Sequence, residues 1–175
     1  MTHDSGQRDY DEMGIPGLLR MARKAYGNEV MAAFADGGFD DVPRNGAYVL
    51  GSVWADSSCF PRLTRELGVS KQAASQLIDT MAMRGYLERT PDAEDRRRML
   101  LTLTPRGEAA ATVSWQAACR VDEELARRLP EQGVQALRAG LIALCAIAAA
   151  GRSDGDDPPA ASRGHDHPHP HDHQH

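Results

Sequence analysis

The chain has 175 residues, of which 41% are hydrophobic and only 5% aromatic, and its formal net charge is −5. This length and composition favour a mainly helical domain with a sizeable core. The acidic N-terminus argues against a secretory signal peptide, and the longest apolar run, residues 139–151, is shorter than the roughly 20 residues that cross a bilayer. We therefore expect a cytoplasmic protein that makes no contact with a membrane and buries this run as a helix.

The first part of the chain predicts helices. Residues 1–12 are polar and predicted to be disordered, whereas apolar side chains recur at helical spacing from Met13 to about Ala35, where Gly37 and Gly38 follow as a stop. The next apolar segment, residues 47–55, suits either a second helix or a buried strand. Its length and its neighbours favour a helix.

The stretch "FPRLTRELGVSKQAASQLIDTMAMRGYLER" predicts two helices joined by a tight turn. Gly68 breaks the first helix, and Ser70 can cap the second by accepting a bond from a free backbone N–H. In the second helix one face is apolar and the opposite face is rich in amides and hydroxyls. This pattern is typical of a helix-turn-helix. The apolar face comprises Ala74, Leu77, Ile78 and Met81.

After Gly85 the pattern changes to that of a hairpin. Residues 86–90 and 99–104 read as short strands on either side of a polar loop that contains three consecutive arginines. Two further helices are predicted at about 108–129 and 131–150, separated by Pro130, and the Asp-, Pro-, Gly- and His-rich residues 152–175 are predicted to be disordered. Residues 57–107 contain nine basic and six acidic side chains, so a basic middle lies between acidic ends.

The segments "LGVSKQAASQLIDTMAMRGYLER" and "DAEDRRRMLLTLTPRGEA" resemble the MarR family of winged helix-turn-helix regulators. The turn, the recognition helix, the strand entry, the Asp-Arg-Arg wing and the Leu-Thr-x-x-Gly exit stand in the family's order and spacing. The resemblance implies a mainly α fold with a small β-hairpin wing, flanked by helices that form a dimer. The implied domains are the N-terminal helices (13–56), the winged helix-turn-helix DNA-binding domain (57–107), the C-terminal dimerisation helices (108–151) and the terminal segments 1–12 and 152–175.

The chemistry of the outer face assigns DNA-binding roles. Gln72 and Gln76 can pair with adenine edges, and Ser75 can reach a base or a phosphate. Lys71 and the backbone amides at Ser70 suit phosphates. On the preceding helix Arg62 and Arg65 can add backbone contacts.

The wing carries the remaining candidates. By resemblance, Arg97 takes the family's minor-groove position, where a narrow A·T-rich groove attracts a guanidinium, and Arg96 and Arg98 flank it. Asp95 is expected to pair with an arginine and hold the shape of the wing. The resemblance also implies a small-molecule effector that binds in the crevice between the dimer helices and the winged domain.

Two other features leave alternatives open. Cys59 falls at or beside the start of the first helix of the motif, where the helix dipole favours a thiolate, but a buried inert thiol is the better hypothesis. The tail "HDHPHPHDHQH" could bind Zn²⁺ or Ni²⁺, although we expect no required cofactor. Its candidate ligands are His165, His167, His169, His171, His173 and His175.

The sequence carries no phosphate-binding loop, zinc-protease motif or nucleophile elbow, so an enzyme is not expected. We predict a homodimeric regulator, most simply a repressor, that binds a pseudo-palindromic site on double-stranded DNA and is released by an effector. The rival is a His-rich metal-binding or metal-responsive protein that uses the winged fold for protein contacts.

Overall fold

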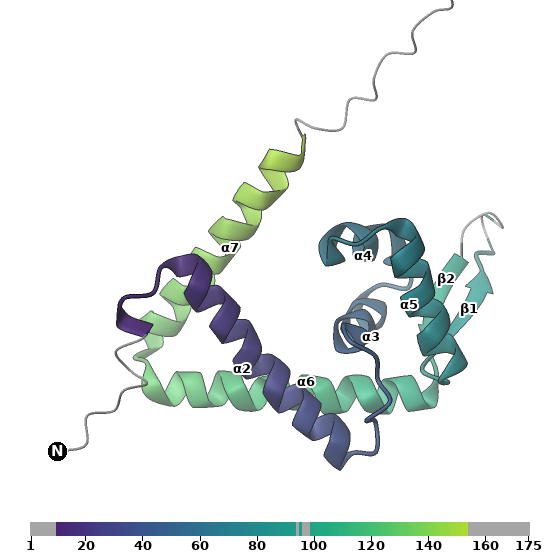
Figure 1. The fold of residues 1–175 in the computed structure, drawn as a ribbon, viewed down its shortest axis with the longest axis horizontal. Coiled ribbons are helices and arrows are strands. Elements are labelled where there is room, and N and C mark those ends of the chain that lie inside the picture. Colours follow the sequence, from purple (N-terminus) through teal and green to yellow (C-terminus); the bar gives the residue numbers. More distant parts are fainter. Residues whose placement is uncertain (1–9, 94, 96–98, 154–175) are drawn as a thin grey trace, which may run out of the picture. The chain divides into compact units, whose positions relative to one another are not determined.

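The computed structural model describes residues 10–93, 95 and 99–153, and the chain divides into two units, Met1–Arg128 and Leu129–His175. The fold is mainly helical with one two-stranded antiparallel hairpin, which confirms the predicted fold class (Figure 1). In chain order the elements are α2 (Ile15–Asp36), α3 (Gly46–Ala55), α4 (Phe60–Leu67), α5 (Lys71–Met83), β1 (Leu87–Pro91), β2 (Met99–Leu103), α6 (Pro105–Arg128) and α7 (Glu131–Ser153).

The long helix α6 packs against both α2 and α3 within the first unit (Figure 1). Arg120 of α6 forms an ion pair with Glu29 of α2 at 2.8 Å. Close by, the Tyr26 hydroxyl donates to the Asp122 carboxylate, and this bond raises the pKa of Tyr26 to about 12. The segment 47–55, which could have been a strand, is part of helix α3, as favoured.

Helices α4 and α5 form the predicted helix-turn-helix. Gly68 ends α4 with a φ of 64°, a left-handed conformation that glycine adopts without a steric penalty. The Ser70 side chain then accepts a bond of 3.1 Å from the backbone N–H of Ala73 and caps α5. The apolar face of α5 is directed inward, because Ala74, Ile78 and Met81 are buried.

Strands β1 and β2 pair in register from Leu87 opposite Leu103 to Pro91 opposite Met99. The hairpin joins the core through Leu87 and Leu101, which are each 2% exposed. It is also tied to the chain before α4, because the N–H of Leu101 donates to the Ser57 carbonyl at 2.9 Å.

The start of α6 differs from the prediction. We expected the helix from residue 108, but it begins at Pro105. Thr104 acts as the cap: its Oγ1 accepts from the N–H of Gly107 at 3.0 Å and its carbonyl from that of Glu108 at 2.8 Å. Proline fits the first helical position because its missing N–H has no partner to lose there.

The core of the first unit lies among α3, α4, α5, the hairpin and the start of α6. Its largest side chains are almost fully buried, and the rings of Phe34 and Tyr86 both contact the ring of Phe39. A continuous core under α4, α5 and the hairpin means that these elements are held as one body.

In the second unit, α7 contradicts the prediction of a buried helix. Its side chains up to residue 150 are exposed, apart from the half-buried Gly133 and Val134. The stretch Glu131–Ala150 has 20 residues and a mean hydropathy of 1.7, so by length and composition alone it could cross a membrane. The sequence analysis measured only the unbroken apolar run, residues 139–151, and so underestimated the length of the apolar helix. Isolated polar residues interrupt such a run but do not end the helix. Within the described part of the second unit, nothing covers the apolar surface of this helix.

Candidate nucleic-acid interface

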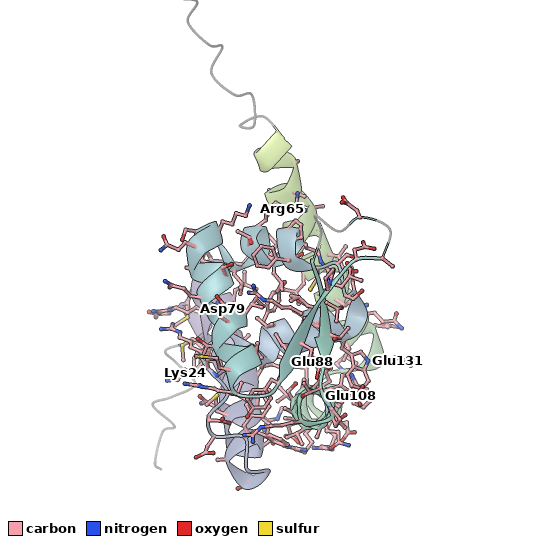
Figure 2. The ribbon with its side chains drawn as sticks, turned by 90° about the vertical axis from the view of Figure 1, so that its right-hand side faces the viewer. Lys24, Arg65, Asp79, Glu88, Glu108 and Glu131 are labelled. Carbon is pink, nitrogen blue, oxygen red and sulfur yellow. The ribbon has the colours of Figure 1, made fainter. Side chains whose placement is uncertain are left out.

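The outer face of α5 presents the side chains that the sequence assigned to DNA. Lys71, Gln72 and Gln76 are exposed, whereas Ser75 is half-buried. Figure 2 faces α5 and the hairpin, with the exposed Asp79 on α5 at this surface. The opposite face of α5 is anchored in the core, so the helix offers these amides and the ammonium group from a fixed backbone.

The N-terminus of α5 is already capped. The Ser70 hydroxyl oxygen accepts from the N–H of Ala73, so within the chain its acceptor role is in use. The remaining free amides of the first turn and the adjacent Lys71 together form a positive end, because an α-helix has a partial positive charge at its N-terminus. An anion such as a phosphate would be favoured there.

An ion pair connects the wing to the recognition helix. Arg89 of β1 contacts the Asp79 carboxylate at 2.8 Å and donates to the Ser75 carbonyl at 3.4 Å. The hairpin and α5 are therefore held at a fixed spacing by side chains on the same surface that carries the candidate contacts. The sequence analysis missed this contact and counted Arg89 only as part of a basic region.

The two arginines of α4 have different environments. Arg65 is exposed in the last turn of the helix. Arg62 is half-buried and lies 3.8 Å from Asp56, while its Nε and Nη2 atoms are buried without a hydrogen-bond partner in the described part of the chain. Of the two, Arg65 is the one that faces solvent in a manner suited to a phosphate.

The wing tip is described only in part. Asp95 is exposed. The three arginines that the resemblance assigned to the minor groove, Arg96, Arg97 and Arg98, lie outside the described residues.

A second polar cluster joins the entry of the hairpin to α6. The Tyr86 hydroxyl donates to the Asp41 carboxylate, and this bond holds the pKa of Asp41 below its usual range. Arg106 contacts the same carboxylate at 2.9 Å and the Tyr86 hydroxyl at 3.1 Å, and its guanidinium lies 4.8 Å from the centre of the Tyr86 ring. Arg84 donates to the backbone carbonyl of Asp41. These arginines serve the fold, so the basic content of residues 57–107 overstates the charge that is available to DNA.

Cys59 is fully buried at the start of α4, and burial raises the pKa of its thiol. The desolvation therefore outweighs the helix dipole, and the thiol stays protonated at neutral pH. This supports the hypothesis of an inert, buried cysteine. Cys119 is half-buried, whereas Cys145 is exposed on α7.

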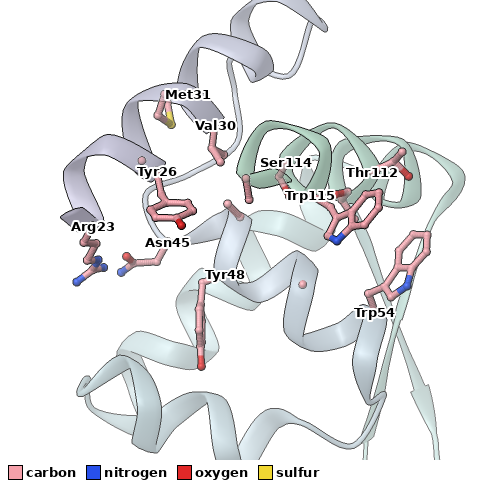
Figure 3. Close-up of a pocket in the computed structure, with 15 residues that line it drawn as sticks. Arg23, Tyr26, Val30, Met31, Asn45, Tyr48, Trp54, Thr112, Ser114 and Trp115 are labelled. Carbon is pink, nitrogen blue, oxygen red and sulfur yellow. Dashed lines mark hydrogen bonds between the residues drawn. The ribbon is translucent and has the colours of Figure 1, made fainter. Parts of the chain in front are cut away.

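A cavity of about 860 Å³ lies among α2, α3 and α6 (Figure 3). Both tryptophans of the chain, Trp54 and Trp115, line it. Tyr26, Tyr48 and aliphatic side chains add to the wall, and Arg23 is its charged lining residue among those described. The cavity suits a bulky apolar molecule. The resemblance predicted a crevice beside the winged domain, but no residue pattern indicated which side chains would line it.

The metal hypothesis concerns residues outside the described part of the chain, since all six candidate histidines of the tail lie beyond residue 153. Within the described ranges, no group of three or more His, Cys, Asp or Glu side chains is arranged to hold a metal ion.

Comparisons with known proteins agree with this geometry. Residues 61–98 match the model of the MarR family. A crystal structure of MarR is 20% identical, with a TM-score of 0.67 and coverage of 82% of this chain and 96% of the other. The reduced form of MarR from E. coli is 23% identical, with a TM-score of 0.59 and coverage of 75% and 96%. Streptococcus pneumoniae FabT in complex with DNA is 18% identical, with a TM-score of 0.65 and coverage of 81% and 95%.

No curated protein sequence matches the chain. The structural matches show that the fold is that of MarR-type winged-helix proteins, and the family model locates the matching sequence in α4, α5 and the hairpin.

Proposed function

We propose that this protein, which has the MarR-family winged-helix fold, is a DNA-binding transcription regulator. The observation that carries the proposal is the solvent-facing row on α5, with Lys71, Gln72 and Gln76 exposed beside a hairpin that Arg89 ties to the same helix. FabT, a structural neighbour with a TM-score of 0.65, was solved in complex with DNA, and this supports the proposal.

In this proposal α5 enters the major groove. The glutamine amides of Gln72 and Gln76 read adenine edges, because an amide offers a donor and an acceptor at the spacing of N6 and N7. Lys71 and Arg65 contact phosphates and fix the register of the helix without reading sequence. The hairpin follows the backbone into the minor groove, where Arg97 is the proposed contact.

The regulator acts as a homodimer in the cytoplasm. The uncovered apolar side chains of α7 support this, because soluble monomers rarely expose a large contiguous apolar surface. A two-fold dimer places two recognition helices about one turn of DNA apart, roughly 34 Å, so the operator is a pseudo-palindrome. Binding there blocks transcription.

A hydrophobic small molecule releases the repressor by binding in the cavity of about 860 Å³. Ring stacking against Trp54 and Trp115 would supply most of the affinity, and Arg23 favours a molecule that carries an acidic group. Since both recognition helices must fit one duplex, a displacement of a few ångströms is enough to reduce affinity.

The test is a selection of bound duplexes from a random-sequence pool, followed by titration of the enriched duplex against random competitor at two salt concentrations. We expect one enriched, pseudo-palindromic motif whose binding weakens as salt rises. Gln76→Ala should lose the selectivity, whereas Gln116→Ala, which changes an exposed glutamine on α6, should keep it. Binding without enrichment, or no binding at all, would contradict the proposal.

A further inference from the structure

One side chain lines the cavity and is also hydrogen-bonded to the helix-turn-helix. Tyr48 on α3 lines the cavity, and its hydroxyl donates to Glu66 Oε2 on α4. In Figure 3 the ring of Tyr48 extends from α3 so that its hydroxyl points away from Tyr26 on α2. The same residue thus faces a prospective ligand with its ring and α4 with its hydroxyl.

The position of α3 allows this bond to connect the cavity to the DNA-reading helices. Figures 1 and 3 show α3 between the α2–α6 pair and the helices of the DNA-reading motif. Helix α4 packs against α5, and Leu63 of α4 is in the same buried cluster as Ile78 of α5. A displacement of α4 is therefore passed to the recognition helix through packed side chains, because a well-packed core moves as a body.

The spacing along α4 offers Glu66 a candidate second partner. Arg62 precedes it by four residues, the spacing that places two side chains on one helix face. Arg62 lies near enough to Tyr48 for its positive charge to oppose the rise in the pKa of the Tyr48 hydroxyl. The Nε and Nη2 atoms of Arg62 are buried without a hydrogen-bond partner in the described ranges. Nη2 lies 3.8 Å from the Asp56 carboxylate, an ion-pair contact too long for a hydrogen bond. A buried N–H without a hydrogen bond favours a rearrangement that supplies an acceptor.

We propose that Tyr48 is a positioning residue that transmits occupancy of the cavity to the recognition helix by exchanging the partner of Glu66. With the cavity empty, Glu66 accepts from the Tyr48 hydroxyl and α4 is held against α3. A molecule stacked against the Tyr48 ring displaces it, Glu66 turns to Arg62, and α4 shifts together with α5. This inference rests on the proposed function, since it concerns how the same cavity regulates DNA binding.

The cavity can be filled without knowing the ligand. Gly51 lines it one helical turn after Tyr48, and a Cβ at this position meets no atom within 4 Å. Gly51→Trp therefore places an indole in the cavity as a substitute for a ligand. Gly51→Ala is the matched control, because it changes the same backbone position and leaves the cavity open.

The measurement is affinity for the selected duplex in a double-mutant cycle. We expect Gly51→Trp to weaken binding about ten-fold, within the usual range of an allosteric coupling, and Gly51→Ala to leave it unchanged. Tyr48→Phe keeps the ring but loses the bond, so it should weaken binding by a similar factor. The double variant Tyr48→Phe with Gly51→Trp should be no weaker than either single one.

Two results would overturn the inference. One is a full additional loss when Gly51→Trp is introduced into Tyr48→Phe, and the other is no effect of Gly51→Trp in the unaltered background. If Gly51→Trp lowers the midpoint of thermal unfolding, Gly51→Leu is used in its place, because leucine fills less of the cavity.

Hydrogen exchange of the amides in residues 60–67 gives a readout that needs no DNA. Gly51→Trp should accelerate exchange in α4 of the parent protein but not in the Tyr48→Phe protein. If no duplex is selected at all, the proposed function fails, while this exchange pattern still decides whether Tyr48 couples the cavity to α4.

Discussion

At the scale of single residues, neighbouring side chains on α5 are expected to contribute differently to DNA binding. Lys71 and Gln72 are adjacent and both exposed. An ammonium group interacts with phosphate charge and releases counterions, whereas an amide pairs with a base edge. The first interaction depends on salt and the second on sequence, so a titration that varies both separates them.

We expect Lys71→Ala to weaken binding to specific and random duplexes by the same factor and to reduce the salt slope by about one. Gln72→Ala should instead cost about 1–3 kcal/mol on the selected duplex and leave binding to random DNA unchanged. The measurement is fluorescence anisotropy on both duplexes over a series of salt concentrations. Equal effects of the two substitutions on both duplexes would refute these roles.

The sequence alone is a weak guide to whether an arginine is free to contact DNA. The sequence shows a cluster of basic residues, but the fold pairs Arg89 with Asp79 and Arg106 with Asp41. The second pair joins positions 65 residues apart, and no local pattern reports such a distance in advance. Exposure on α5 was predictable because helical periodicity determines it, whereas ion pairing depends on how elements pack.

At the scale of elements, the short-range signals predicted the helix-turn-helix well. Gly68 and Ser70 act within a few residues, so the turn and the cap of α5 could be identified from the sequence. The start of α6 was missed by three residues because Thr104 was interpreted as the end of a strand and the helix was expected only after Gly107. The cavity could not be derived, since its wall combines residues from three helices that meet only in the folded chain.

Gly107 marks a close approach between elements that a side chain would prevent. A Cβ there would lie 2.0 Å from the Tyr86 carbonyl oxygen, a backbone atom that cannot turn away. The first turn of α6 would have to move off the hairpin entry, where the Thr104 N–H donates to that same carbonyl at 3.1 Å. The contact explains why the exit from the wing needs glycine.

We therefore expect Gly107→Ala to lower the free energy of unfolding by about 1–3 kcal/mol, as overpacking does. Gly51→Ala is the comparison, because its Cβ meets nothing within 4 Å and alanine favours the interior of a helix. That change should raise the free energy of unfolding by about 0.5–1 kcal/mol. Urea denaturation followed by circular dichroism measures both. A neutral Gly107→Ala would mean that α6 and the hairpin are less closely joined.

At the scale of the whole molecule, the exposed apolar side chains of α7 are difficult to explain in a monomer. Leu137, Leu141 and Leu144 recur at the spacing of one helix face and are each at least 40% exposed. The apolar run at residues 139–151 predicted a buried helix, and the resemblance placed residues 108–151 in a dimer. An apolar run by itself cannot distinguish an intramolecular from an intermolecular partner. A second copy with the same face would bury it symmetrically.

We expect the protein to sediment as a dimer and Leu141→Glu to shift it toward monomer, because the substitution places a charge in the apolar face of both copies at once. Gln135→Glu adds the same charge at an exposed polar position of α7 and should leave the dimer intact. Monomeric Leu141→Glu should also lose affinity for the full pseudo-palindrome while binding a half-site as the parent does, since the surface of α5 is unchanged. Analytical ultracentrifugation and titration of full and half duplexes test both consequences. A dimer that persists in Leu141→Glu would place the interface elsewhere.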